Sequence, residues 1–290
     1  MKTILVLTDF SEHAKRAAEY ALELAKKIKA DLLLCNTFLV PADISTTGFS
    51  MWPQEEYGIL SDESKRELNL LKKHLQDQLD TNQGGSNFHP NIDINYADGG
   101  IADVVKAMKP GIDIKLIVAG THEKEALSDF LLGNNVNNMI DNISFPLLLI
   151  PAGTAFKPLK KIIFATDLVF MDNDEKAFYQ LVELARSLNA EILVTHIFNE
   201  KNNKPEFEKR IKGLLSNISN KADYPNIYYR IVNEEIPEKG LSWLCENGQV
   251  DMLAMVHQDH DLFQKIFDSS HTQKMAEQIG IPLLVLPNQS

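Results

Sequence analysis

This sequence of 290 residues has little positive charge. It holds 29 Lys and Arg against 40 Asp and Glu, which gives a formal net charge of −11. A protein that binds nucleic acid or an anionic membrane uses a basic surface to replace counterions, so this deficit argues against both classes of partner. The charge by itself indicates no other partner.

Cysteine and long apolar runs are also scarce. The two cysteines, Cys35 and Cys245, lie in apolar surroundings and in no CxxC pair, which excludes a disulfide framework and predicts buried free thiols. No run approaches the length of a membrane span. The N-terminal run Ile4–Leu7 is too short for a signal peptide and is followed by Asp9. We therefore expect a cytoplasmic protein without a membrane partner.

What the sequence does contain is an alternation of buried strands and amphipathic helices. Thr3–Thr8 and Asp31–Phe38 are apolar runs typical of strands that are buried on both faces. Between them, Ser11 is placed to cap a helix that extends to Ile28 and carries an alanine-rich stripe. Strands that alternate with helices predict an α/β fold, with a parallel sheet covered on both faces.

A long stretch, Leu39–Leu60, interrupts this pattern. It contains two prolines, two glycines and three aromatic residues, so it is expected to be irregular, with the next helix opening at Ser61. The stretch is either a lid over a crevice in the first half or an arm that packs against the rest of the protein. The packing arm is the simpler interpretation, because exposed aromatic residues usually find a surface.

The pattern then starts again after a linker rich in proline and glycine. Lys161–Asp167 repeats Thr3–Asp9, and Leu188–Phe198 repeats Ile28–Phe38. A third segment, residues 251–276, aligns without a gap to residues 115–140. The sequence therefore predicts two tandem domains, 1–151 with an inserted loop at 39–60, and 158–290.

One stretch of the first half has the form of an anion site. An apolar strand, Leu116–Ala119, breaks at Gly120, continues as a polar loop and reaches a second glycine, Gly133, before a helical segment. A strand, a glycine turn and a helix N-terminus direct free backbone N–H groups and the positive end of the helix dipole to one point.

The segments ILVLTDFSEHAKRAAEYALELAKKIKADLLL and DIKLIVAGTHEKEALSDFLLGNNVNNMIDNISFPLLLIP resemble the universal stress protein family. The resemblance covers nearly the whole chain as two copies. It implies two flavodoxin-like (adenine nucleotide alpha hydrolase-like) domains, each a five-stranded parallel sheet with the order 3-2-1-4-5. In such sheets a ligand binds beyond the carboxyl ends of the strands at the topological switch point.

The resemblance also implies ATP, with magnesium, in the first domain. Asp9 matches the acidic residue of the family, and Gly120 and Gly133 match the first and last glycines of its nucleotide loop. The nucleotide-binding residues that it assigns here are Thr8, Asp9, Asn36, Gly120, Thr121, His122, Gly133, Asn134, Asn135 and Val136.

Two residues depart from the family pattern. Asn134 replaces a serine or threonine, and Glu123 replaces the middle glycine. Two like charges ~4 Å apart repel by about 1 kcal/mol in water and about 4 kcal/mol near a protein surface. If Glu123 points toward a triphosphate, ATP affinity falls by roughly one to three orders of magnitude. If it points to solvent, only the conformational freedom of glycine is lost.

The second copy of the loop is further degraded. Val256, Asp259 and Ser269 replace all three glycines, although Asp167 remains, so no nucleotide is expected in the second domain. Three histidines are predicted near the carboxyl ends of its strands, namely His196, His257 and His260, and His271 is predicted to open the last helix close by. They match no metal motif, and we predict no metal site.

The chain shows no nucleophile–base pair and no Walker lysine, so we predict no catalytic residues and no enzyme. The resemblance implies a regulatory or protective binding module. Two alternatives stay open: an interaction protein that binds no nucleotide, and a weak ATPase. The apolar segments FPLLLIP and IPLLVLP predict exposed edges, through which the resemblance implies an intramolecular pseudo-dimer of the two domains. Whether two chains form a homodimer stays open.

Overall fold

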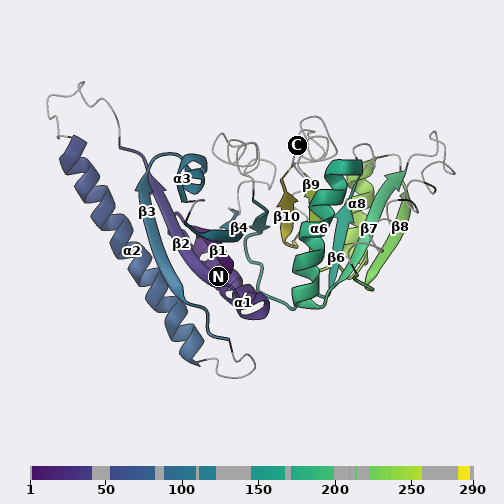
Figure 1. Ribbon diagram of the computed structural model, residues 1–290, viewed down its shortest axis with the longest axis horizontal. Helices are drawn as coiled ribbons and strands as arrows, with labels where there is room; N and C mark the ends of the chain where they lie inside the picture. Colours follow the sequence, from purple (N-terminus) through teal and green to yellow (C-terminus); the bar gives the residue numbers. More distant parts are fainter. Residues whose placement is uncertain are drawn as a thin grey trace. The chain divides into compact units, whose positions relative to one another are not determined.

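A computed structural model describes most of the chain as two compact units, Met1–Gly120 and Thr121–Ser290 (Figure 1). The described residues are 2–40, 53–81, 88–108, 111–121, 145–166, 171–198, 209, 213, 223–234, 236–256 and 280–287.

Among the described residues of the first unit, four parallel strands follow the order β3-β2-β1-β4. The strands are β1 (Lys2–Leu7), β2 (Asp31–Phe38), β3 (Ile92–Asp98) and β4 (Asp113–Gly120). Residues Ile4, Leu5 and Val6 of β1 are fully buried, as expected for a central strand that has helices on both faces. Leu7 is paired with Cys35 and Val6 with Val118, so the carboxyl ends of β1, β2 and β4 lie at one edge.

The helices described beside this sheet are α1 (Glu12–Ile28), α2 (Pro53–Thr81) and α3 (Ile101–Met108). The predicted cap of α1 is confirmed, because the Ser11 Oγ accepts a hydrogen bond from the Ala14 N–H at 3.2 Å. The helix ends at Lys29, which has a left-handed backbone (φ 55). Right-handed crossovers place α1 and α2 on one face of the sheet and α3 on the other.

Helix α2 corrects one expectation from the sequence. Residues 53–60, predicted to be irregular, form its first two turns rather than part of a loop. Pro53 is suited to the first helical position, because its missing N–H has no partner there in any case and its φ is already helical. Glu55 and Glu56 in the first turn complement the helix dipole. Residues 41–52 of the predicted stretch lie outside the described residues.

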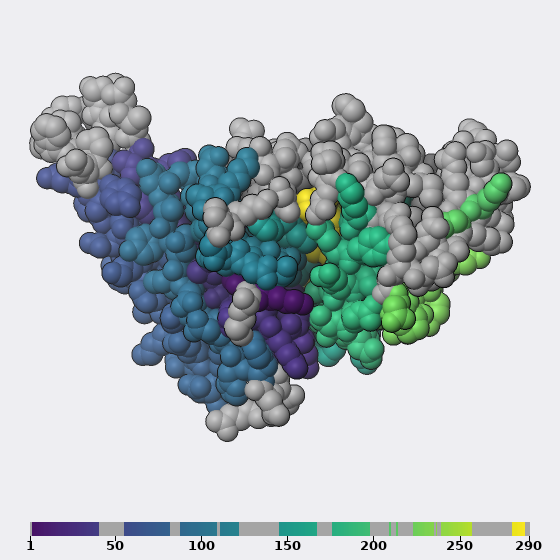
Figure 2. All heavy atoms as spheres, viewed as in Figure 1, coloured from purple at the N-terminus to yellow at the C-terminus, as the bar shows by residue number. Residues whose placement is uncertain are grey.

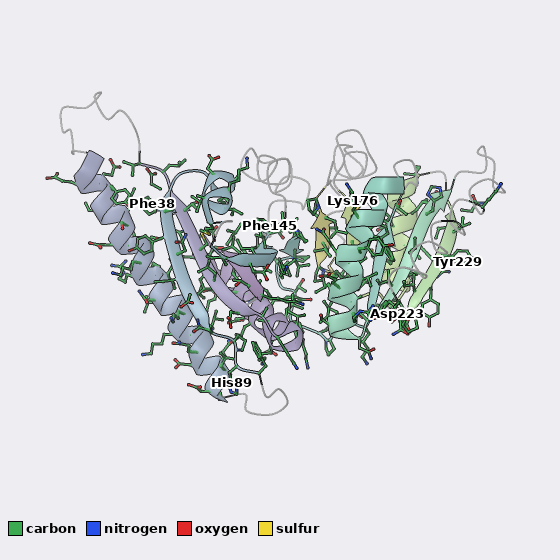
Figure 3. The ribbon with its side chains drawn as sticks, viewed as in Figure 1. Phe38, His89, Phe145, Lys176, Asp223 and Tyr229 are labelled. Atoms are coloured by element: carbon green, nitrogen blue, oxygen red, sulfur yellow. The ribbon has the colours of Figure 1, made fainter. Side chains whose placement is uncertain are left out.

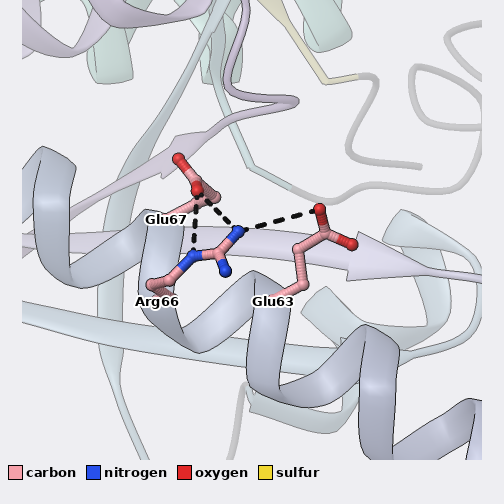
Figure 4. Close-up of polar contacts among 3 residues, drawn as sticks. All are labelled: Glu63, Arg66 and Glu67. Carbon is pink, nitrogen blue, oxygen red and sulfur yellow. Dashed lines mark hydrogen bonds and ion pairs between the residues drawn. The ribbon is translucent and has the colours of Figure 1, made fainter.

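The two faces of α2 differ. Leu68, Leu71 and Leu75 are buried against the sheet, at the spacing of a helical stripe. The outer face reaches the surface of the unit, where α2 appears in blue (Figure 2). On that face Arg66 lies 3.2 Å from Glu67 and 4.0 Å from Glu63 (Figure 4). Such exposed ion pairs add little stability.

In the second unit the described residues form six strands in the order β5-β10-β9-β6-β7-β8. Its elements are β5 (Leu147–Ile150), β6 (Lys161–Ala165), α6 (Met171–Leu188), β7 (Glu191–Phe198), β8 (Ile227–Asn233), α8 (Pro237–Asn247), β9 (Met252–Val256) and β10 (Leu283–Leu286). The five strands of the second repeat therefore follow the expected order 3-2-1-4-5.

The two apolar segments that were predicted to form edges pair with each other. β5, the last strand of the first repeat, lies antiparallel to β10, the last strand of the second, with Leu148 opposite Leu284. Both strands are fully apolar and buried. Each one thus gives the other a partner for its backbone groups and its side chains.

The part of the chain that the structure describes has no helix with the length and apolar character that a membrane crossing needs. Both cysteines are free, as predicted. Cys35 is buried, whereas Cys245 is half-buried.

Candidate functional site

The loop after β1 is a tight turn that presents Asp9. The Thr8 N–H donates to the Cys35 carbonyl at 3.0 Å, and the Thr8 Oγ1 accepts from the Phe10 N–H at 3.0 Å. The Asp9 Oδ1 accepts from the Ser11 N–H, also at 3.0 Å. Phe10 has φ 66, a left-handed conformation that is uncommon for a residue other than glycine. Thr8 is buried and Asp9 is exposed, so the carboxylate lies on the surface where β1 ends.

Asn36 lies beside this turn, near the end of β2, and its amide is already engaged by the protein. Its Nδ2 donates to the Thr8 carbonyl at 2.7 Å. Its Oδ1 accepts from the Ser64 Oγ of α2 at 2.8 Å. The sequence predicts that the Asn36 amide contacts a ligand. In the structure its Nδ2 holds the Thr8 carbonyl and its Oδ1 holds α2. Ser64 is not among the residues predicted from the sequence, although a serine in the apolar stripe of a helix is a signal that could have pointed to it.

Gly120 ends β4, the strand next to β1. A β-carbon on Gly120 would lie 2.7 Å from the carbonyl oxygen of His13 and 3.1 Å from the Ala14 nitrogen, so the first turn of α1 approaches the bare backbone of β4. The close packing of α1 therefore explains the glycine at this position, whether or not a phosphate binds there. β1 and β4 lie on the two sides of the point where the chain reverses its strand order, which is the usual ligand position in such sheets.

Of the remaining predicted nucleotide-binding residues, the structure describes only Thr121. Thr121 is buried, and its N–H donates to the Ile150 carbonyl at 3.0 Å. His122, Gly133, Asn134, Asn135 and Val136 lie outside the described residues, and so does Glu123. The structure thus brings Thr8, Asp9, Asn36 and Gly120 to one edge of the first unit.

The second repeat has the same arrangement of hydrogen bonds at the end of β6, with His196 in the position of Asn36. The Thr166 N–H donates to the Thr195 carbonyl at 3.1 Å. Buried His196 contacts the Thr166 carbonyl through its Nδ1 at 2.9 Å, so the Nδ1 must carry the proton. Asp167, His257, His260 and His271 lie outside the described residues. Among the residues that are described, no group of three or more His, Cys, Asp or Glu is placed to hold a metal ion.

The thiol next to Asn36 is not a nucleophile at neutral pH. Burial raises the pKa of Cys35 to about 11, and a hydrogen bond from Asn95 only partly opposes this shift. The nucleophilic form of cysteine is the thiolate, and with this pKa it is scarce at neutral pH. The polar groups at the described edge are therefore backbone groups, hydroxyls and the Asp9 carboxylate.

The comparisons with known proteins agree with this fold. The sequence profile of the Universal stress protein family matches residues 1–151 and 158–287. No curated protein sequence matches the chain. A universal stress protein from Archaeoglobus fulgidus has a similar structure, with a TM-score of 0.66 and 13% identity over 99% of this chain and 96% of that one.

Two further solved structures are similar over almost the full length. One is a putative universal stress protein from Pseudomonas aeruginosa, with a TM-score of 0.57 and 12% identity over 98% of this chain and 92% of that one. The other is the cytoplasmic domain of a prokaryotic cation chloride cotransporter, with a TM-score of 0.54 and 9% identity over 98% of this chain and 93% of that one. At these identities the likeness concerns the fold.

Proposed function

Because the chain belongs to the universal stress protein family, we propose that it is a regulatory or protective binding module that binds ATP in its first domain. We take the domains as 1–151 and 158–290, with no nucleotide in the second. In this proposal the protein acts in the cytoplasm and catalyses no reaction.

The observation that carries this proposal is the position of Asp9. Its exposed carboxylate follows β1, and β1 is paired through Val6 with Val118 of β4, two residues before Gly120. This is the switch point where ligands of open α/β sheets lie. A carboxylate there is suited to accept hydrogen bonds from the ribose hydroxyls of a nucleotide.

The proposed site divides into two halves. The nucleoside half consists of Thr8 and Asp9, with Asn36 behind them. The phosphate half consists of Gly120, Thr121, His122, Gly133, Asn134, Asn135 and Val136, with magnesium bound together with the phosphates. In the second repeat Val256 stands in the position of Gly120, and a side chain there blocks the close approach of a phosphate to the backbone.

One observation favours a second candidate function, an interaction module without nucleotide. The close approach of His13 to Gly120 explains this glycine without any ligand. Glu123 replaces the middle glycine of the family pattern, and its carboxylate would repel a triphosphate if it pointed toward one. In this alternative the protein uses the surfaces of the family fold for interaction, either as a single chain or as a homodimer.

Thermal unfolding of the full chain with and without Mg-ATP separates the two functions. A ligand present at 100 times its dissociation constant stabilises the folded state by ~2.7 kcal/mol. We expect Asp9→Asn to reduce the shift, and the matched change Asp167→Asn in the second repeat to leave it unchanged. Glu123→Gly should enlarge the shift. A wild-type protein that shows no shift at millimolar Mg-ATP contradicts nucleotide binding and favours the interaction module.

A further inference from the structure

Helix α2 has one polar residue in its buried stripe. Of residues 55–81, four are buried, namely Ser64, Leu68, Leu71 and Leu75, and Ser64 is only 3% exposed. A buried hydroxyl without a partner is unfavourable, so a serine at this position calls for a specific acceptor. That acceptor is the Oδ1 of Asn36, 2.8 Å away.

The direction of each hydrogen bond in this connection is fixed. The Thr8 carbonyl can only accept, so Asn36 must direct its NH₂ group toward it, at 2.7 Å. The Asn36 Oδ1 therefore faces α2, and the Ser64 hydroxyl must be the donor. Ser64, Asn36 and Thr8 thus form a continuous chain of hydrogen bonds, here called the relay, from the inner face of α2 to the last residue before Asp9.

The relay ends at a turn that needs support. Phe10 has a left-handed backbone (φ 66), a strained conformation for a residue other than glycine that persists only where its surroundings hold it. The Thr8 hydroxyl accepts from the Phe10 N–H, and the Thr8 carbonyl is held by Asn36. The position of Thr8 therefore sets the direction in which Asp9 leaves the sheet.

A second contact joins α2 to the same end of β2. The ring of Tyr57 lies 5.7 Å from the ring of Phe38, centroid to centroid. Phe38, labelled in Figure 3, is the last residue of β2. Tyr57 precedes Ser64 by about two helical turns, so both side chains lie on the same face of α2. The helix thus holds the end of β2 at two points.

The second repeat supports the same role independently. His196 occupies the position of Asn36, and its Nδ1 contacts the Thr166 carbonyl at 2.9 Å. Thr166 occupies the position of Thr8. An amide in one repeat and an imidazole in the other therefore hold the carbonyl of the residue that directly follows the first strand.

We propose that Ser64 and Asn36 are positioning residues for the ATP site of the first domain. They fix the Thr8 carbonyl, and through it the presentation of Asp9, and neither of them contacts the nucleotide. This inference rests on the proposed function for its ligand. It makes α2 a determinant of affinity although the helix contributes no ligand-contacting residue.

The first test measures the turn without nucleotide, by hydrogen exchange of the backbone amides of Phe10 and Ser11 in the full chain. Ser64→Ala removes the donor from the relay, so we expect faster exchange at both amides. Ser187→Ala is a matched control, because Ser187 lies on the exposed face of α6 and its hydroxyl donates to the Glu183 carbonyl of the same helix. Exchange at Phe10 and Ser11 that does not change in Ser64→Ala overturns the inference.

The second test compares ATP dissociation constants at a temperature where circular dichroism shows every variant to be folded. We expect Ser64→Ala to weaken ATP binding by about 10-fold, which corresponds to about 1.4 kcal/mol. Asn36→Leu, which removes the donor to Thr8, should have at least the same effect. Asn36→His, which introduces the donor found in the second repeat, should restore most of the affinity.

The outcomes separate this inference from the proposed function. If wild-type protein binds ATP and Ser64→Ala binds it equally well, the positioning role is wrong and the function stands. If wild-type protein binds no ATP but exchange rises in Ser64→Ala, the proposed function is wrong and the relay from α2 to the turn is supported. A loss of thermal stability alone, with an unchanged dissociation constant, also overturns the positioning role.

Discussion

The carbonyl oxygen of His13, in the first turn of α1, lies 2.7 Å from the point that a β-carbon on Gly120 would occupy. The nearest atoms all belong to the backbone of His13 and Ala14, so no side chain can rotate away to make room. Gly120→Ala should therefore destabilise the protein by about 1–3 kcal/mol, the usual cost of overpacking. Urea denaturation measures this cost, and an unchanged midpoint would show that α1 moves away freely.

Gly58 provides the opposite case. It lies inside α2, and a β-carbon there would have no heavy atom within 4 Å. Gly58→Ala should stabilise the protein by roughly 0.5–1 kcal/mol, because alanine restricts the unfolded chain and favours the helix. The same denaturation experiment tests this change beside Gly120→Ala. A destabilised Gly58→Ala protein would mean that residues 53–60 are not helical in solution.

The buried face of α2 should contribute more to the stability of the protein than its exposed face. Leu68 is fully buried, whereas Leu70, two residues later, is 57% exposed. We expect Leu68→Ala to cost about 2–5 kcal/mol through lost burial and a cavity. Leu70→Ala should change stability by less than about 0.5 kcal/mol. Equal effects of the two substitutions in chemical denaturation would contradict the described orientation of the helix.

The two thiols should react slowly in the folded protein. Burial raises the pKa of Cys35 from 9.0 to about 11. It raises that of Cys245 to about 12, where the nearby Glu246 carboxylate adds to the effect. Because the thiolate is the reactive form, a thiol reagent at pH 8 should modify both residues only after denaturant is added. Rapid modification of Cys35 in native protein would contradict its burial.

The same shifts predict a loss of stability at alkaline pH. Well below pH 9.0 both thiols are protonated in the folded and the unfolded states, so their contribution to stability is complete. Between pH 9.0 and about 11, the unfolded chain releases protons that the folded chain keeps, and stability falls as the pH rises.

The size of this loss approaches about 1.4 kcal/mol per pH unit for each thiol. Tyrosines and lysines titrate in the same range, so the measurement compares two proteins. We expect the urea midpoint of a variant with Cys35→Ala and Cys245→Ala to fall less steeply between pH 8 and pH 10.5 than that of wild type. Parallel pH profiles for the two proteins would exclude the thiols as the cause.

The strands and α1 could be predicted from the sequence because each depends on local patterns. Its apolar run alone predicts β2 at Asp31–Phe38, and the structure gives the same bounds. The Ser11 cap was likewise readable from residue type and position. The start of α2 was not, because Pro53 and Gly58 usually mark loops. Here the proline takes the first helical position and the glycine faces open space.

The candidate site was predicted less completely, for a different reason. Asp9 and Gly120 are recognisable from a motif, since residue type and spacing are enough to assign them. Whether Asn36 faces a ligand or the protein depends on Ser64, which is distant in the sequence and adjacent only after α2 packs on β2. A single sequence gives little information about such pairs, because either residue alone is unremarkable.

The antiparallel pair of β5 and β10 has a consequence for how the two repeats can change. In an assembly of two identical chains, every substitution appears in both binding loops at once. Here the partner strands belong to one polypeptide, so their pairing does not depend on protein concentration, and each loop can accept substitutions independently. The first loop has kept Gly120, while the second has Val256 in its place. A single covalent chain thus allows the two repeats to take on different tasks while their stoichiometry stays one to one.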